Sequence, residues 1–243
     1  MSESAAPQPP SLTHLPDVVR SHLERALATT VGGQQVRITQ RGEMWLKPNG
    51  RAMRFEAAQS FALDRVAFWW RARFPVLGPL KLQVVDDYAD ADGKLEVRLL
   101  GLPVQRRRGP ETVQGEALRY LAELPFAPPA MILNDALEWR GIDERTAEVA
   151  TIVSGERLAI RLEANDDGDF VHSSSTMRLF KVGREWVPTP WGGEFGQYET
   201  IGGMRLPTRG EAYWELPERR YVYWRGTLTS AELLDRSFRR DEP

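Results

Sequence analysis

Cysteine is absent from the 243 residues of the chain. Its absence excludes disulfide bonds, thiolate metal sites and a cysteine nucleophile. Histidine is scarce, and the three residues lie far apart without ligand spacing, so no metal site is expected at His14, His22 or His172. The formal net charge of −2 gives no argument for a nucleic-acid partner or for an anionic membrane surface.

Long apolar runs and nucleotide-binding motifs are also missing. No apolar run approaches the roughly 20 residues that a membrane-spanning helix needs. The chain has neither a G-x-G-x-x-G motif nor a P-loop, so nucleotide binding has no support and no cofactor is expected. The first residues, MSESAAPQPPSLTH, lack the basic region and apolar core of a signal peptide. A cytoplasmic location is therefore expected.

Two acidic stretches imitate calcium loops without completing them. When DDYADADG (86–93) is aligned on its aspartates, the first position of the loop is Tyr88 and the twelfth is Leu99, and neither supplies a carboxylate. The stretch EANDDG (163–168) has Ser174 at its twelfth position. Both stretches are better explained as hairpin turns, so no metal ligand is assigned.

Alternating apolar and polar residues are what the chain has in abundance. Period-two segments separated by turn sequences predict an antiparallel sheet with one buried face, first over 36–46, 53–63, 66–74, 80–84 and 95–99. Further strands are expected at 136–140, 145–153, 158–164, 170–181, 194–201, 209–216 and 220–229. Nearly a dozen strands in one sheet must curl or split in order to bury their apolar face.

Helices and chain ends complete the predicted organisation. Apolar residues at helical spacing predict a helix over 16–28, and a second helix over 115–124 is followed by a proline break and another helical turn that ends near 133. The proline-rich residues 1–13 are expected to be disordered. We therefore expect a single β-rich domain over 14–235 and a flexible C-terminal tail over 236–243.

Two glutamines interrupt the apolar face of the first predicted hairpin. A four-residue loop over 48–51 would pair Leu46 with Met53 and, further along, Gln40 with Gln59. Facing amides can satisfy each other's hydrogen bonds, which is a purely structural explanation. Alternatively, this part of the face lines a cavity, because small-molecule sites combine apolar walls with a few placed polar groups.

The central helix supplies a second pair of candidates. Arg119 and Glu123 are four residues apart and so share one helix face. They form either a surface ion pair or, if the helix lies across the hollow of the sheet, polar groups that point into it. The following residues, LPFAPPAMI (124–132), are too apolar to be freely exposed, which favours the second arrangement.

Aromatic residues and a polar stretch complete the candidates. Trp191 lies in VPTPWGGEFGQY (187–198), where prolines and glycines predict a loop that holds it either for binding or as a plug at one end of the sheet. Tyr198 follows on a strand and could face either side. Periodicity also leaves open the face of His172, and no G-x-S-x-G elbow or third partner turns His172 and Ser174 into a catalytic set.

Several longer motifs resemble a known family. They include Q-x-G-x-M-W (40–45), F-x-A-x-Q-x-F (55–61), F-W-W-x-A (68–72), GEALRYLAELPFAPPA (115–130), L-E-W (137–139) and P-x-P-W-G-G-E-F-G-Q-Y (188–198). Over roughly 15–230 the chain resembles a bacterial family of uncharacterised proteins that has no assigned activity, so no catalytic role is carried over. The pattern is also similar to the half-barrel lipid and lipoprotein carriers of the LolA type. Those carriers are exported, whereas this chain shows no export signal.

These observations predict a mainly β (α+β) protein with one long curved antiparallel sheet. The sheet would form an open or half barrel, and helices over 16–28 and 115–133 would cover its hollow. We expect a lipid-like or apolar ligand there, contacted by Gln40, Gln59, Arg119, Glu123, Trp139, Trp191 and Tyr198. The alternatives are a hydrolase-type enzyme that uses Glu123 and a protein–protein interaction module. No catalytic residue, metal or cofactor is assigned, and the oligomeric state is not predicted.

Overall fold

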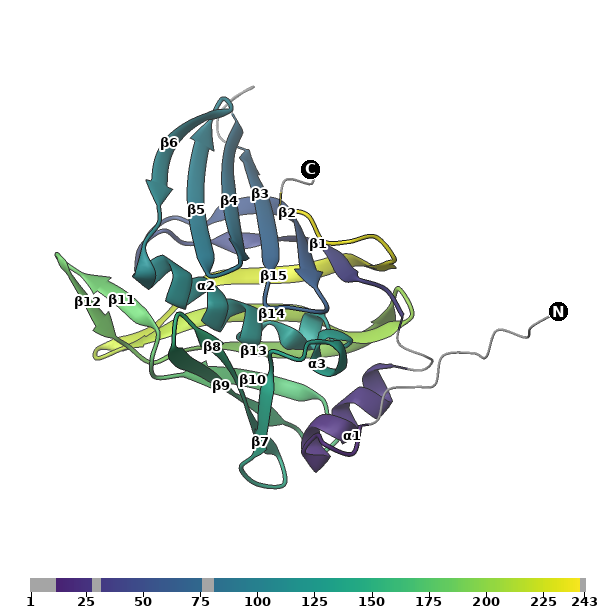
Figure 1. Cartoon of the computed structure of the whole chain (residues 1–243). Coiled ribbons are helices and arrows are strands. Elements are labelled where there is room, and N and C mark those ends of the chain that lie inside the picture. Colours follow the sequence, from purple (N-terminus) through teal and green to yellow (C-terminus); the bar gives the residue numbers. More distant parts are fainter. Residues whose placement is uncertain (1–11, 28–31, 76–80, 241–243) are drawn as a thin grey trace.

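One antiparallel sheet dominates the protein (Figure 1). The structure is a computed structural model that describes residues 12–27, 32–75 and 81–240. Residues 1–11, most of the N-terminal tail that the sequence predicts to be disordered, lie outside the described residues. The strands are β1 Gln35–Met44, β2 Met53–Ala62, β3 Phe68–Pro75, β4 Lys81–Ala89, β5 Asp92–Leu99, β6 Leu102–Arg107, β7 Glu138–Gly141, β8 Thr146–Val153, β9 Glu156–Ala164, β10 Phe170–Ser175, β11 Leu179–Val182, β12 Glu185–Pro188, β13 Trp191–Ile201, β14 Met204–Leu216 and β15 Arg219–Leu234.

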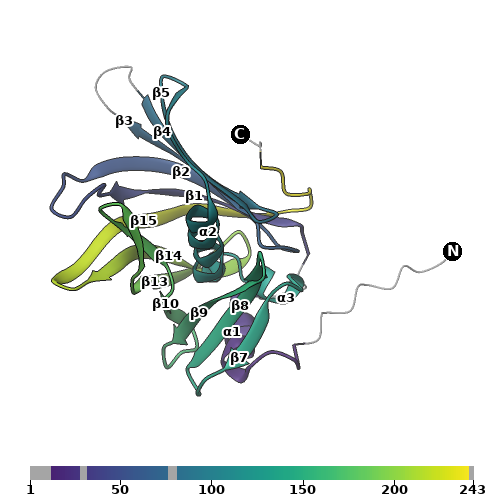
Figure 2. The same ribbon diagram turned by 60° about the vertical axis from the view of Figure 1, so that its left-hand side comes forward.

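The sheet is long, curved and open, as the sequence predicts. Its 13 strands follow the order β6-β5-β4-β3-β2-β1-β15-β14-β13-β10-β9-β8-β7, and β11 pairs with β12 in a separate hairpin. In the part of the chain that the structure describes, the edge strands β6 and β7 do not pair with each other. The sheet instead bends around helix α2 (Pro110–Ala122), which fills its hollow (Figure 2).

The helices lie where the sequence places them, with shifted ends. Helix α1 (Asp17–Ala26) is shorter than the predicted 16–28, and residue 28 lies outside the described ranges. Helix α2 begins five residues before the predicted start because Pro110 occupies its first turn, directly after Gly109, whose φ is 119°. After α2, the chain forms the short 3-10 turn η1 (Leu124–Phe126) and α3 (Ala130–Leu133). Within the described residues, no helix is long and apolar enough to cross a membrane.

Helix α2 holds the two wings of the sheet together. It contacts β4 and β5 near one edge and β8 and β9 near the other. Leu118, Tyr120 and Leu121 of the helix are fully buried, as are Phe61 of β2 and Phe170 of β10. The core therefore lies between the concave face of the sheet and this helix, and most of the stabilising burial of apolar surface occurs there.

The predicted register of the first hairpin is wrong by two residues. Met44 pairs with Met53, so residues 45–52 form the loop, and Gln40 faces Ala57 rather than Gln59. The strands separate early because the backbone N–H of Trp45 donates to the carbonyl of Tyr223 on β15 instead of to β2. A shift of two keeps every side chain on its predicted face, because strands have a period of two.

A row of glycines lies where three neighbouring strands approach one another closely. Gly42 of β1 pairs with Gly226 of β15, which pairs in turn with Gly210 of β14. A Cβ on Gly42 would lie 2.0 Å from the carbonyl oxygen of Arg225, and one on Gly226 would lie 2.4 Å from the indole of Trp224. This row therefore lets the strands approach more closely than any side chain would allow.

The chain end packs against the outer face of the sheet. Phe238 is buried in a small cluster with Trp69, and Arg240 forms ion pairs with Asp87 and Asp92. Residues 236–240, within the tail that the sequence predicts to be flexible, thus contact the sheet through an apolar ring and a paired guanidinium. Residues 241–243 lie outside the described ranges.

Candidate functional site

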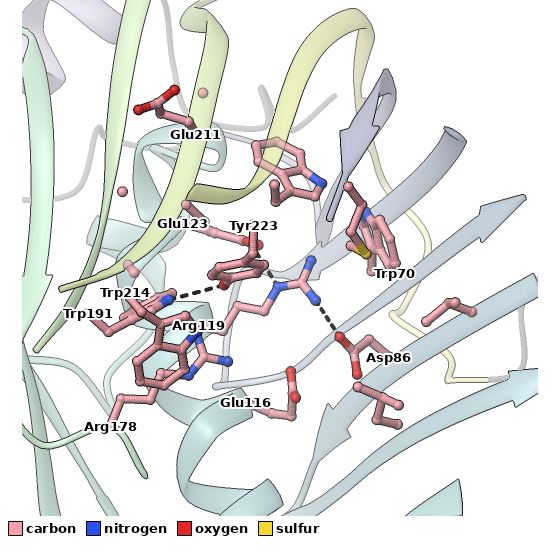
Figure 3. Close-up of a pocket in the computed structure, with 18 of the residues that line it drawn as sticks. Trp70, Asp86, Glu116, Arg119, Glu123, Arg178, Trp191, Glu211, Trp214 and Tyr223 are labelled. Carbon is pink, nitrogen blue, oxygen red and sulfur yellow. Dashed lines mark hydrogen bonds and ion pairs between the residues drawn. The ribbon is translucent and has the colours of Figure 1, made fainter. Parts of the chain in front are cut away.

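A cavity of about 380 Å³ lies between α2 and the concave face of the sheet. Its walls combine β3 to β5 on one side with β13 to β15 on the other, and α2 forms its floor (Figure 3). Five of the eight tryptophans in the chain line it, namely Trp45, Trp70, Trp191, Trp214 and Trp224. An aromatic concentration of this kind offers a large apolar surface together with N–H donors.

The two glutamines form a hydrogen-bonded chain that ends at the cavity. Trp70 Nε1 donates to Gln40 Oε1 at 3.0 Å, and Gln40 Nε2 donates to Gln59 Oε1 at 3.4 Å. Gln59 Nε2 then donates to Glu123 Oε2. The amides are brought together diagonally rather than face to face, and both are buried behind the cavity wall. Their role is to hold Trp70 and Glu123 in place.

Arg119 lies on the floor of the cavity and is paired with two carboxylates. Its Nε donates to Glu123 Oε1 at 2.8 Å, and its Nη1 donates to Asp86 Oδ2 at 2.6 Å. The guanidinium also lies over the rings of Phe68 and Trp70, at 5.0 and 5.2 Å from their centroids. Burial opposes its charge, but the Glu123 and Asp86 carboxylates raise the pKa of Arg119 above its ordinary value.

Glu116 is a buried carboxyl group with an incomplete set of partners. It is 5% exposed, and its Oε2 has no hydrogen-bond partner among the described residues. Burial and, after it, the nearby negative charge of Asp86 raise the pKa of Glu116 to about 8. Burial also raises the pKa of Asp86, but Arg119 opposes that shift. Since only Asp86 has an ion-pair partner, Glu116 is the carboxyl that keeps its proton at neutral pH.

Arg178 differs from Arg119 in its surroundings. Its guanidinium lies 4.1 Å from the ring centroid of Trp191 and 5.5 Å from that of Trp214. Its Nη1 is buried without a hydrogen-bond acceptor, and within the described ranges no carboxylate forms an ion pair with it. Of the three arginines that line the cavity, Arg119 is paired with carboxylates, Arg178 is not, and Arg107 is exposed on the edge strand β6.

Unpartnered polar atoms are concentrated in this cavity. Nine buried side-chain atoms lack a hydrogen-bond partner in the described part of the chain. Five of the nine belong to residues that line the cavity: Asp86 Oδ1, Glu116 Oε2, Ser173 Oγ, Arg178 Nη1 and Trp224 Nε1. Buried polar groups almost always have partners, so a cluster of exceptions in one cavity calls for a physical explanation.

Three of the residues singled out by the sequence line the cavity: Arg119, Glu123 and Trp191. The predicted loop around Trp191 is a correction, because Trp191 is the first residue of β13 and pairs across the sheet with Trp214. Its Nε1 donates to the hydroxyl of Tyr223 at 3.0 Å, which fixes the indole in the wall.

Trp139 and Tyr198 lie elsewhere. Trp139 is on β7 and borders a shallow surface pocket beside Pro16, while the hydroxyl of Tyr198 donates to the carbonyl of Phe170 beside α1. The structure therefore does not bring either aromatic residue into the cavity.

Several polar residues that line the cavity are not predicted from the sequence, among them Glu116, Asp86, Ser173 and Arg178. Glu116 precedes Arg119 by three residues, so helical spacing could have placed it on the same face. Asp86 follows Val84 at period two, but the adjacent Asp87 leaves the inward aspartate ambiguous. Ser173 and Arg178 lie in the stretch whose facing the pattern left open.

Comparisons with known proteins identify a family but supply no activity. The profile described as "Family of unknown function (DUF6544)" matches residues 5–226. No curated protein matches the chain. Among solved structures, the chain is similar to a LolA superfamily protein from Nitrosomonas europaea, with a TM-score of 0.45 and 12% identity over 90% of this chain and 93% of that one. It is also similar to a β-barrel-like DUF1849 protein from Brucella abortus, with a TM-score of 0.28 and 11% identity over 85% and 100%.

No ligand or activity is transferred from either structure. The function must therefore be argued from the cavity itself.

Proposed function

The chain belongs to DUF6544, a family of unknown function, and from that premise we propose that it binds one small amphiphilic molecule in the cavity over α2. The apolar part of the ligand packs against the tryptophan rings, and its polar part meets the floor around Glu116 and Arg178. A volume of about 380 Å³ falls within the usual range of small-molecule sites.

The five unpartnered polar atoms are the observation that carries this proposal. A buried donor or acceptor without a partner costs about 1–3 kcal/mol, so a hydrogen bond from a ligand to any of these atoms would stabilise the complex. A ligand that supplies partners removes this cost and also covers apolar surface. Burial of its apolar part contributes roughly 25 cal/mol for each Å² removed from water.

The alternative of a hydrolase that uses Glu123 has no support in the geometry. Glu123 Oε1 accepts from Arg119, and Oε2 accepts from Gln59. Each oxygen is therefore committed to a neighbour within the protein, and the carboxylate anchors the floor of the cavity. The assignment of a positioning role to Glu123 favours binding over acid–base chemistry.

Native mass spectrometry of the purified protein tests the proposal. We expect a complex of one chain with one amphiphile, either retained from the host or formed on addition of a panel of amphiphiles. The Ala212→Phe variant, which adds a ring inside the cavity, should lose this complex. Ala58→Phe is the matched control because Ala58 is a half-buried alanine that borders the outer face of the sheet.

Two results would overturn the proposal. One is the absence of any complex across the whole panel. The other is equal retention of the ligand by wild type and by the Ala212→Phe variant, provided that both remain folded.

A further inference from the structure

We infer that the cavity selects amphiphiles with a singly charged anionic head group, a carboxylate, and that Arg178 binds this group. The inference rests on the proposed function and assigns the class of ligand. It begins from the difference between Arg119 and Arg178, the two cavity arginines that are not fully exposed; the third, Arg107, is exposed on the edge strand β6.

Arg119 is not available to a ligand anion. Two carboxylates, Glu123 and Asp86, already accept from it, and its faces are covered by aromatic rings. The two carboxylates already balance the charge of Arg119, so it does not attract a further anion. Recognition of an anion must come from another residue.

Arg178 is the cation that has room for a ligand. Its guanidinium lies over the rings of Trp191 and Trp214, and a guanidinium in contact with aromatic rings can still donate hydrogen bonds to a carboxylate. Arg178 is half-buried and forms no ion pair within the described residues, and a guanidinium matches a carboxylate with two parallel hydrogen bonds. One unpaired guanidinium balances one negative charge, which favours a carboxylate over a doubly charged phosphate monoester.

The other unpartnered atoms supply further donors. Trp224 Nε1 is a donor only, Ser173 Oγ can donate, and Glu116 carries a proton because burial raises its pKa to about 8. Asp86 Oδ1 is the one acceptor without donor capacity in this set. The cavity therefore offers more donors than acceptors, which suits the oxygen-rich head group of an acid.

A cationic head group is the competing possibility. Aromatic walls can hold a quaternary ammonium ion through cation–π contacts. In this cavity, however, the ring of Trp191 already carries Arg178, and the like charge would repel a second cation. The competing head group becomes one arm of the test.

Isothermal titration calorimetry with delipidated protein and four probes of equal chain length tests the inference: laurate, dodecanol, dodecyltrimethylammonium and dodecyl phosphate. We expect laurate to bind at least about tenfold more tightly than the other three, and Arg178→Gln to weaken laurate at least about tenfold, because loss of one partner of a buried charge pair costs several kcal/mol. Dodecanol affinity should change little in this variant. The matched control is Arg184→Gln, which alters an exposed arginine between β11 and β12.

The outcomes separate the two proposals. Equal affinity for laurate and dodecanol, or laurate binding that Arg178→Gln does not change, overturns the assignment of the head group while leaving amphiphile binding intact. Tighter binding of the ammonium or the phosphate probe rejects the carboxylate. Failure of all four probes overturns the proposed function itself.

A pH series gives a second test that does not depend on Arg178 variants. Glu116 faces Asp86 of β4, Arg119 and Glu123 of α2, and Arg178 before β11. Its ionisation adds a negative charge beside the head group, so laurate affinity should fall between about pH 7 and pH 9. Glu116→Gln should abolish this decrease. A decrease of the same size in the variant would show that Glu116 does not face the ligand.

Discussion

Two side chains carry the functional argument, Glu116 and Arg178, and each has a buried polar atom without a hydrogen-bond partner among the described residues. Glu116 and Arg178 are charged-type residues held near aromatic surfaces without the partners that Arg119 and Glu123 have. Proteins normally pair such groups when they bury them. The pairing of one arginine and the isolation of the other, in the same cavity, is the contrast on which the functional argument depends.

Glu116 should make the stability of the protein fall as the pH rises. Its pKa is about 8 when folded and 4.5 in the unfolded chain, so the folded state binds more protons between these values. The stabilising contribution is therefore complete below about pH 4.5 and is lost towards pH 8, by up to about 1.4 kcal/mol per pH unit. We expect Glu116→Gln to flatten this slope in urea unfolding measured at several pH values.

The exposed Glu144, in the turn between β7 and β8, provides the matched control. Glu144→Gln should leave the pH slope as in the wild type. Identical slopes for both variants would contradict the burial of a neutral carboxyl group at position 116.

Gln59 should contribute more to stability than its single amide suggests. Gln59→Leu removes the donor to Glu123 and the acceptor of Gln40 together, so two buried groups lose a partner. We expect a loss of about 2–4 kcal/mol in urea unfolding. Gln83→Leu, on the outer face of β4, is the control and should change stability by much less. Equal effects of the two substitutions would remove the structural role assigned to the amide chain.

At the scale of elements, glycines determine how closely the strands β1, β15 and β14 approach. Gly42→Ala places a Cβ against the backbone carbonyl of Arg225, where no side-chain rearrangement can relieve the contact. We expect a loss of about 3 kcal/mol, measured by thermal or urea unfolding. Gly196→Ala is the control, since a Cβ there meets nothing within 4 Å. A Gly42 variant as stable as the control would show that the strands separate at little cost.

The sequence predicts the elements well and their ends less well. The alternation of apolar and polar residues identifies most strands because a strand buried on one face has an apolar residue at every second position. Strand β6 has no such alternation, because it is an edge strand whose residues are all exposed, including Leu102 and Val104. The hairpin register depends on the bond between Trp45 and Tyr223, which joins residues far apart in the chain.

The site shows the same division. Helical spacing predicts the pair Arg119 and Glu123, because the contact is local. Asp86 and Arg178 reach the cavity only through the curvature of the whole sheet, and nothing in their immediate sequence records it.

At the scale of the whole molecule, α2 is the element that joins the two wings of the sheet. It contacts β4 and β5 in one wing and β8 and β9 in the other. The proposed single domain over 14–235 therefore implies that both wings unfold together. Because α2 fills most of the hollow, the cavity is the space that remains between this helix and the aromatic residues of the sheet.

Leu118→Ala tests this cooperation. Leu118 is fully buried on α2, so its truncation should cost about 2–5 kcal/mol. Hydrogen exchange followed by mass spectrometry should show faster exchange in β4 and β5 and in β8 and β9 alike. Leu46→Ala, at a residue that is 69% exposed, is the control. Faster exchange in one wing alone would show that the wings are independent units.

The gathering of tryptophans around one cavity gives the molecule an optical consequence. Five of its eight indoles share that wall, so the ultraviolet emission of the chain is weighted towards the surroundings of a single space. An occupant that displaces water from these rings should move the emission to shorter wavelengths, and one that draws Arg178 away from Trp191 should change its intensity. The intrinsic tryptophan fluorescence of the protein should therefore report binding in the cavity without an added label.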